Sequence, residues 1–170
     1  HTQFLGNTLE EIATEKAGII KCGIPVVIGE TTEATEKVFR TKANEVGAPI
    51  IFTEDEEPLI GATPKGSGFE YSTKNYGIIN GELGGYCQEK NAATILTAIE
   101  RLKQDGYNIT EDSIRKGFTS VTKLTGLMGR WQTIGERPRT VCDAGHNIGG
   151  VEYPVEWSAD SDTVKFIVNE

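Results

Sequence analysis

The stretch "TLEEIATEKAGIIKCGIPVVIGE" (8–30) places a helix directly before a short apolar strand. Thr8 and Glu11 have the Thr-x-x-Glu spacing of a capping box, which predicts that the helix begins at the next residue, Leu9. The segment 23–30 is rich in β-branched residues and is bounded by glycine, which predicts a buried strand. The apolar stripe of the helix consists of Leu9, Ile12, Ala13 and Ile20.

Lys16 stands at helical spacing from that stripe, four residues after Ile12 and three after Ala13, so the pattern predicts an ammonium group in the buried face. One interpretation is that the side chain snorkels and keeps its charge in water. A second is that burial favours the neutral amine, which can act as a base or a nucleophile. A neutral amine can also take up carbon dioxide, and the resulting carbamate is an oxygen ligand suited to Mg²⁺. The helix alone leaves these alternatives open.

Helices and short apolar strands alternate further along the chain, which favours an α/β fold with a mostly parallel sheet. The acidic run 54–58 is expected to be a solvated loop, and a small antiparallel ribbon is expected within 59–82. A long helix is predicted over 91–106, with Ile95, Ile99 and Leu102 facing inward. The other predictions are a helix over 31–48, a strand over 49–53, a helix from Thr110, and strands over 131–134, 140–144 and 164–168.

Composition sets the broad class of the protein. The 170 residues are 37% hydrophobic and 25% charged, which is ordinary for a soluble globular domain. A net charge of −8 argues against nucleic acid as the main partner. No segment resembles a membrane span or a signal peptide. The three cysteines are far apart in the sequence and odd in number, which indicates free thiols in a reducing cytoplasm.

Four stretches together resemble the folylpolyglutamate synthase/dihydrofolate synthase family of the Mur ligases. The first, 1–27, matches the family's His-x-x-x-Leu-Gly-x-Thr followed by Ile-Ala-x-Glu-Lys-Ala-Gly-Ile. "GGYCQEKNAATILTAIE" (84–100) is similar to its Tyr-Gln-x-x-Asn-Ala helix start. "GLMGRWQ" (126–132) is similar to its Gly-Arg domain linker, and "CDAGHNIGG" (142–150) to its Asp-x-x-His-Asn loop. The resemblance covers residues 1–150 in the family's order.

The resemblance implies an ATP-dependent ligase with ATP and Mg²⁺ as cofactors. Such an enzyme adds L-glutamate to dihydropteroate or to a folate through an acyl phosphate, and we expect a cytoplasmic monomer. Residues 1–125 are expected to form the C-terminal part of the central ATPase domain. Residues 126–170 are expected to form the linker and the start of a Rossmann-like glutamate-ligase domain.

For the metal, the resemblance implies that Lys16 is carbamylated and holds Mg²⁺, with His1 as a second ligand. This interpretation makes Lys16 a catalytic candidate, because metal ions must offset the repulsion between a carboxylate and a phosphate. The arrangement requires no contribution from Glu15 or Lys21, which flank Lys16 in the sequence.

For the nucleotide, the resemblance implies contacts from Asn91 to adenine, Arg130 to the phosphates, Asp143 to the ribose and His146 to the phosphates. His146 is the second catalytic candidate. Taken residue by residue, Asn91 could equally be an N-cap, and Arg130 a surface residue beside a hinge. Asp143 could equally begin an Asx-turn into the glycine-rich loop.

One departure from the family is the missing phosphate-binding loop Gly-x-x-x-x-Gly-Lys-Ser/Thr. The segment "GATPKGSG" (61–68) has glycines and a lysine but the wrong spacing. We therefore expect a fragment that is inactive alone and whose parent protein is the ligase. The alternatives are a Mur-family ligase for a cell-wall precursor, an inactive nucleotide-binding module, and a hydrolase with a carbamylated lysine. The last is disfavoured because the chain has only 2 histidines.

Overall fold

The computed structural model describes residues 8–143 with the exception of residues 86, 131 and 138. None of the helices in this part of the chain is long and apolar enough to cross a membrane. The helices are α2 (Leu9–Ala17), α3 (Glu33–Val46), α4 (Thr53–Glu56), α5 (Cys87–Gln104), α6 (Glu111–Thr119) and α7 (Val121–Thr125). The strands are β1 (Val26–Ile28), β2 (Ile50–Phe52), β3 (Leu59–Lys65), β4 (Gly68–Thr73), β5 (Gly77–Gly81), β6 (Gln132–Glu136) and β7 (Arg139–Cys142).

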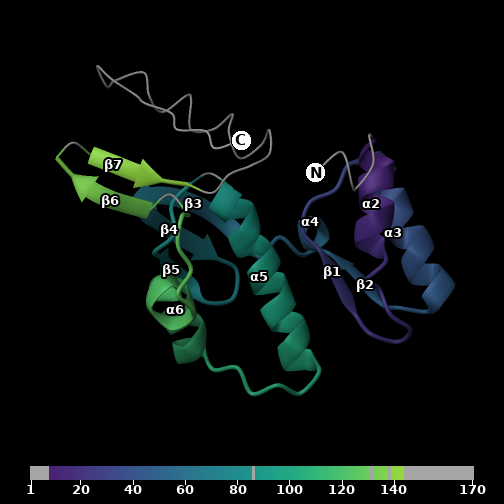
Figure 1. Cartoon of the computed structure of the whole chain (residues 1–170). Coiled ribbons are helices and arrows are strands. Elements are labelled where there is room, and N and C mark those ends of the chain that lie inside the picture. Colours follow the sequence, from purple (N-terminus) through teal and green to yellow (C-terminus); the bar gives the residue numbers. More distant parts are fainter. Residues whose placement is uncertain (1–7, 86, 131, 138, 144–170) are drawn as a thin grey trace.

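The α/β class is confirmed, and the described strands divide into one parallel pair and two antiparallel sheets. Strand β1 pairs with β2 in parallel, with α2 and α3 beside them (Figure 1). Strands β3, β4 and β5 form an antiparallel sheet in that order, as expected for 59–82. Strands β6 and β7 form an antiparallel hairpin. Most of the described strand pairs are therefore antiparallel, whereas a mostly parallel sheet was expected. The connections between these strands are short, and short connections join antiparallel neighbours.

Helix α2 begins where the sequence predicts, and its capping box is formed. The Thr8 side chain accepts from the Glu11 backbone N–H at 3.2 Å, and the Glu11 carboxylate accepts from the Thr8 N–H at 3.2 Å. The predicted position of Lys16, however, is wrong: its side chain is exposed. The buried stripe runs through Ala13 and Ala17, whose small side chains let α3 pack closely, and it leaves Lys16 outside.

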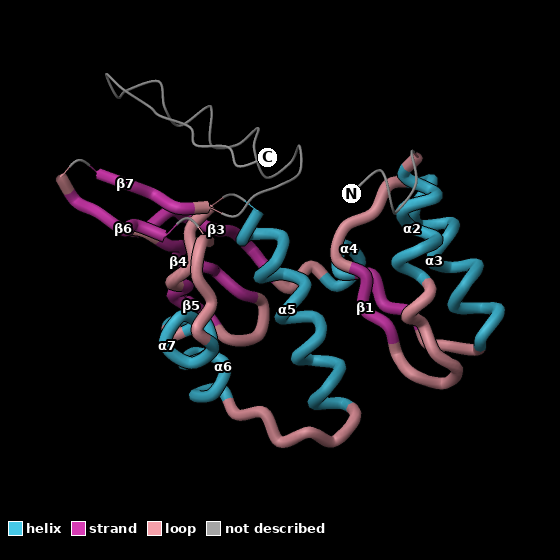
Figure 2. The backbone as a smooth tube through the Cα atoms, in the orientation of Figure 1, coloured by secondary structure: helices cyan, strands magenta, loops and turns pink. Residues whose placement is uncertain are grey.

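Helix α5 begins at Cys87, four residues earlier than predicted, and lies between the parallel pair and the antiparallel strands (Figures 1 and 2). Its buried face carries Ala92 and Leu96, whereas Ile95 and Leu102 are 48% and 40% exposed. The prediction that Ile95 and Leu102 face inward was therefore wrong. The helix carries two apolar stripes, and the one with the smaller residues fits against the aromatic side chains of β4.

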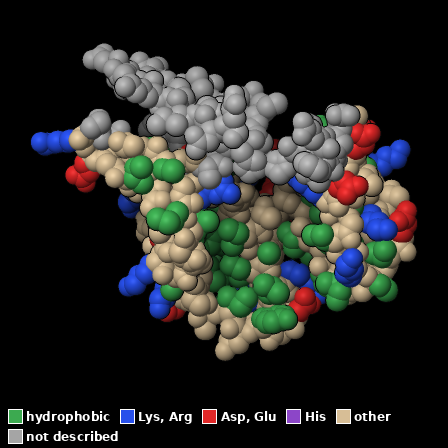
Figure 3. Space-filling view, in the orientation of Figure 1, with side chains coloured by type: hydrophobic (Ala, Val, Ile, Leu, Met, Phe, Trp, Pro, Cys, Tyr) green, Lys and Arg blue, Asp and Glu red, His purple; other side chains and the backbone are tan. Residues whose placement is uncertain are grey.

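The other apolar stripe of α5 contributes to the surface of the described part. Hydrophobic side chains gather in the middle of the face drawn in Figure 3, where Figure 1 places α5.

The acidic run 54–58 was expected to be a loop, but Thr53–Glu56 forms the short helix α4. The Glu54 carboxylate accepts from the Thr31 hydroxyl at 3.0 Å and so links the ends of β1 and β2.

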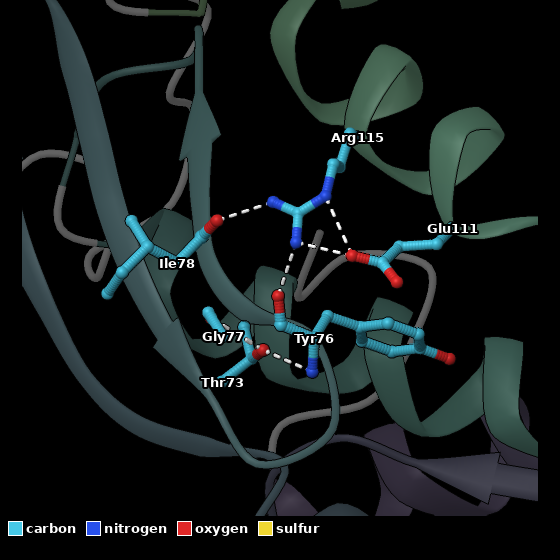
Figure 4. A network of polar contacts seen from close by, with 6 residues as sticks. All are labelled: Thr73, Tyr76, Gly77, Ile78, Glu111 and Arg115. Atoms are coloured by element: carbon cyan, nitrogen blue, oxygen red, sulfur yellow. Dashed lines mark hydrogen bonds and ion pairs between the residues drawn. The ribbon is translucent and has the colours of Figure 1, made fainter.

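A single arginine ties α6 to the β4–β5 connection (Figure 4). Arg115 donates to the backbone carbonyls of Tyr76 and Ile78 and forms an ion pair with Glu111, one turn earlier on α6. The Thr73 hydroxyl accepts from the Tyr76 N–H at 3.0 Å and donates to the Gly77 carbonyl at 2.8 Å. These contacts hold α6 against the sheet on which α5 also packs.

We predict that Arg115→Met lowers the free energy of unfolding by about 1–3 kcal/mol, because two carbonyls lose a charged donor. Urea denaturation measures this. The matched control is Arg101→Met, which removes only an i,i+4 pair with Asp105 and should cost at most about 0.5 kcal/mol. Equal losses in the two variants would contradict the role given to the carbonyl contacts.

Candidate functional site

Three of the predicted site residues meet at the start of α5. Burial raises the pKa of the Cys87 thiol, the Asp143 carboxylate raises it further, and the Arg130 guanidinium lowers it. Both charges must lie near Cys87 to act on its pKa. Asn91 is one helical turn after Cys87 and therefore on the same side of α5. The Arg130 and Asp143 charges thus lie near enough to the first turn of α5 to act on Cys87, although 52 positions separate Asn91 from Asp143.

Asn91 lies within α5 and is exposed. The N-cap interpretation is excluded, because four helical residues precede Asn91 in α5. Its side-chain amide donates from Nδ2 to Oε1 of Gln88 at 3.2 Å. The side chain is therefore held at one end and accessible at the other, as a binding residue requires.

Arg130 lies between α7 and β6 and lines a cleft of about 230 Å³. The residues before it turn sharply, with Gly126 and Gly129 in the left-handed region at φ 72° and 68°. The Gly129 N–H donates to the Gln132 side chain at 3.0 Å, which ties the turn to β6. Other residues that line the cleft are Ser67, Glu82, Thr122 and Leu127.

Glu82 also lines the cleft and is held by two hydrogen bonds. The Glu82 carboxylate accepts from the Thr122 N–H at 2.8 Å, and the Glu82 N–H donates to the Phe118 carbonyl at 3.0 Å. Glu82 therefore joins the end of the antiparallel sheet to α7. The cleft is therefore lined by a guanidinium and by a carboxylate that already accepts a hydrogen bond, and guanidinium geometry suits an anion such as phosphate.

Asp143 directly follows β7, as the sequence predicts, and is exposed. Strand β7 pairs antiparallel with β6, and this hairpin brings Asp143 back toward the start of α5. His146 and the rest of its glycine-rich loop lie outside the described residues, as does the predicted strand 164–168.

Lys16 lies away from this group of residues. Figure 1 places α2 and the β6–β7 hairpin at opposite ends of the described part. The exposed Lys16 ammonium has no hydrogen-bond or ion-pair partner among the described residues. His1 lies outside those residues. Within the described ranges, no three His, Cys, Asp or Glu side chains come together as a metal-binding group.

Gln88, whose side chain is buried and contacts Asn91, is not among the site residues predicted from the sequence. The signal was present in the Gln-x-x-Asn spacing, because residues three apart are neighbours on a helix. It could not be used because α5 was predicted to begin at Asn91, which placed Gln88 outside the helix.

Comparison with known proteins shows what the chain is similar to. The dihydrofolate synthase/folylpolyglutamate synthase of Bacillus subtilis is 36% identical over 163 residues, which cover 89% of this chain and 36% of the relative. The folylpolyglutamate synthase of Lacticaseibacillus casei is 31% identical over 156 residues, 89% of the chain and 36% of the relative. The chain matches the folylpolyglutamate synthase/dihydrofolate synthase family. It spans about a third of the length of these relatives, and no protein-family model matches it.

Solved structures agree with this match. A point mutant of L. casei FPGS aligns with a TM-score of 0.76 and 29% identity, over 93% of this chain and 39% of that one. An FPGS–AMPPCP–folate complex aligns with a TM-score of 0.75 and 29% identity, over 92% of this chain and 38% of that one. The Mycobacterium tuberculosis enzyme with ADP and AMPPCP, at 24% identity and a TM-score of 0.76, supports the fold alone.

The electrostatic geometry around Cys87 predicts opposite effects of two substitutions. Asp143→Asn lowers the Cys87 pKa and speeds alkylation by iodoacetamide at neutral pH, because thiolate is the reactive form. Arg130→Gln raises the pKa and slows the reaction. The rate is measured against pH in a background in which Cys22 and Cys142 are replaced by serine.

Arg101→Gln, near the other end of α5, is the control for this experiment and should leave the alkylation rate unchanged. If Arg130→Gln and Asp143→Asn moved the Cys87 pKa in the same direction, the proposed gathering of charges at the start of α5 would be wrong.

Proposed function

We propose that the protein is an ATP-dependent ligase that joins L-glutamate to dihydropteroate or to a folate. The observation that carries the proposal is the match to folylpolyglutamate synthases over about nine-tenths of the chain, a relative with AMPPCP and folate among them. AMPPCP is an analogue of ATP. The positions of Asn91, Arg130 and Asp143 around one end of α5 support a nucleotide site made by this chain.

In the proposed reaction the substrate carboxylate attacks the γ-phosphate of ATP, which releases ADP and forms an acyl phosphate. The amine of L-glutamate then attacks the acyl carbon, and inorganic phosphate leaves as the amide bond forms. Both steps bring anionic groups together, so they depend on positioning and on charge neutralisation. Arg130 serves this need by binding phosphate oxygens, with Asn91 at the base and Asp143 at the ribose. His146 would approach the phosphates from the following loop.

Lys16 is proposed to act as a carbamate that holds Mg²⁺, with His1 as a further ligand. The Lys16 side chain is exposed and has no partner among the described residues, so its Nζ, once deprotonated, is accessible to carbon dioxide and to a metal. The carbamate would offer the hard oxygen donors that Mg²⁺ prefers. When bound, Mg²⁺ would offset the charge between the phosphate and the acceptor carboxylate.

The proposed division places residues 1–125 in the central ATPase domain and 126–170 in the linker and the next domain. The left-handed turns at Gly126 and Gly129 support a boundary there. We also propose a monomer in a reducing compartment such as the cytoplasm, in keeping with three free, exposed cysteines. The net charge of −8 supports small-molecule partners over nucleic acid.

The test of this function is ADP release by the full-length protein that contains this chain. Release should require both L-glutamate and either dihydropteroate or tetrahydrofolate. Release with muramyl peptides in their place would assign the protein to a cell-wall ligase. Binding of ATP without any glutamate-dependent release would leave a nucleotide-binding module and would contradict the proposal.

For Arg130, we predict that Arg130→Gln raises KM for ATP about 10- to 100-fold, the cost of one charge-assisted hydrogen bond. Steady-state kinetics on the full-length protein measure this. Arg137→Gln, an exposed residue on the β6–β7 turn, is the matched control and should leave KM unchanged. An unchanged KM in Arg130→Gln would remove this residue from the nucleotide site.

For Lys16, we predict a carbamate carbon signal in the ¹³C NMR spectrum of the protein in ¹³C-bicarbonate. Lys16→Arg should abolish the signal, because a guanidinium does not form the carbamate. Lys21→Arg, an exposed lysine whose ammonium donates to the Gly18 carbonyl at 3.1 Å, should retain it. A signal that survives Lys16→Arg would place the carbamate elsewhere or exclude it.

A further inference from the structure

Gln88 is a buried polar side chain directly beneath the proposed nucleotide site. It is 8% exposed and lies in the first turn of α5. Its Oε1 accepts the hydrogen bond from Nδ2 of Asn91 at 3.2 Å. Asn91 itself is exposed, so this contact joins a buried residue to the surface amide of the site.

The backbone of Gln88 is anchored at both of its polar groups. Its N–H donates to the Gly85 carbonyl at 3.0 Å, and its carbonyl accepts from the Tyr71 hydroxyl at 3.4 Å. Tyr71 is 2% exposed, and burial is the main cause that raises the pKa of its hydroxyl to about 12. The hydroxyl therefore remains a donor over the whole physiological pH range.

The tyrosine is itself held by close packing. Its ring stacks on Phe69 at 5.8 Å between centroids and meets Phe118 edge-on at 5.9 Å. A Cβ at Gly81 would lie 2.5 Å from the Tyr71 ring, so β5 can approach the ring only with glycine at this position. The start of α5 thus rests on an aromatic cluster that leaves little freedom to Gln88.

This anchoring has a consequence for the polarity of Asn91. A primary amide has a donor end and an acceptor end. Because Nδ2 donates one of its two hydrogens to Gln88, the amide is turned with Nδ2 toward Gln88, and Oδ1 is the acceptor that it presents to a ligand. An acceptor at this position can accept a hydrogen bond from the exocyclic amino group of adenine. The keto oxygen of guanine is itself an acceptor and cannot form that hydrogen bond.

We propose that Gln88 is a positioning residue that sets the orientation of the Asn91 amide and so selects adenine over guanine at the nucleotide site. The inference rests on the proposed function, in which Asn91 contacts the base of ATP. Gln88 acts through Asn91 and touches no substrate. Discrimination follows because a site with a fixed acceptor rejects a base that offers only a second acceptor there.

The experiment compares kcat/KM for ATP and for GTP in the full-length protein. Gln88→Leu removes the acceptor and frees the Asn91 amide to rotate, so the ATP/GTP ratio should fall about tenfold, the value of one hydrogen bond. Gln88→Glu keeps an acceptor toward Nδ2 and should preserve the ratio. Glu89→Gln, on the exposed side of the same turn, is the matched control. Thermal unfolding checks that each variant is folded.

The outcomes separate this inference from the proposed function. A Gln88→Leu variant that loses activity equally with ATP and GTP, and so keeps its ratio, would make Gln88 a structural residue and overturn the inference. Asn91→Leu tests the site itself. If it raises KM for ATP while the ratio in Gln88→Leu is unchanged, the site stands and the inference falls. If it leaves KM unchanged, the placement of the base at Asn91 fails, and the inference fails with it.

Discussion

The buried Tyr71 side chain supports the start of α5, on which the arrangement of the proposed site depends: its ring packs with Phe69 and Ala92, and its hydroxyl donates to the Gln88 carbonyl. Helix α5 contacts both the antiparallel sheet and the parallel strand pair. Its Ala92 packs on the aromatic residues of β4, and its Lys90 forms an ion pair with Glu30, which follows β1. A shift of the first turn of α5 would therefore displace Asn91 with respect to both sheets.

The start of α5 interacts electrostatically with two residues that flank the β6–β7 hairpin, Arg130 and Asp143. The Asp143 carboxylate raises the pKa of the Cys87 thiol, and the Arg130 guanidinium lowers it. These two groups come from either side of the β6–β7 hairpin, whose antiparallel pairing brings its ends together. In the proposed site, this cation, this carboxylate and the Asn91 amide would be the partners for phosphate, ribose and base.

Local patterns in the sequence predicted the local structure well. The capping box at Thr8, the strands at 23–30 and 49–53, and the helix after Thr110 follow from spacing and propensity, and all are present. Such features depend on neighbours in sequence. The motif resemblance named a family whose members match about nine-tenths of the chain in sequence and in structure.

The errors arose where contacts between distant segments decide the outcome. The Lys16 side chain is exposed because α3 packs on the face of α2 that carries Ala13 and Ala17. Helical periodicity alone did not show that the buried face of α2 is narrow enough to leave Lys16 outside. The early start of α5 and the burial of Gln88 depend on Tyr71 and Gly85, which no helical pattern includes. The meeting of Arg130 and Asp143 at Cys87 likewise requires the β6–β7 hairpin.

The most direct test of the central claim, that a nucleotide binds at the start of α5, is protection of the Cys87 thiol. The alkylation rate of Cys87 is measured in the full-length protein with its other cysteines replaced, with and without saturating ATP. We expect ATP to slow alkylation severalfold, because the nucleotide would cover the helix start near Asn91 and Arg130. An unchanged rate, under conditions where calorimetry shows that ATP is bound, would contradict it.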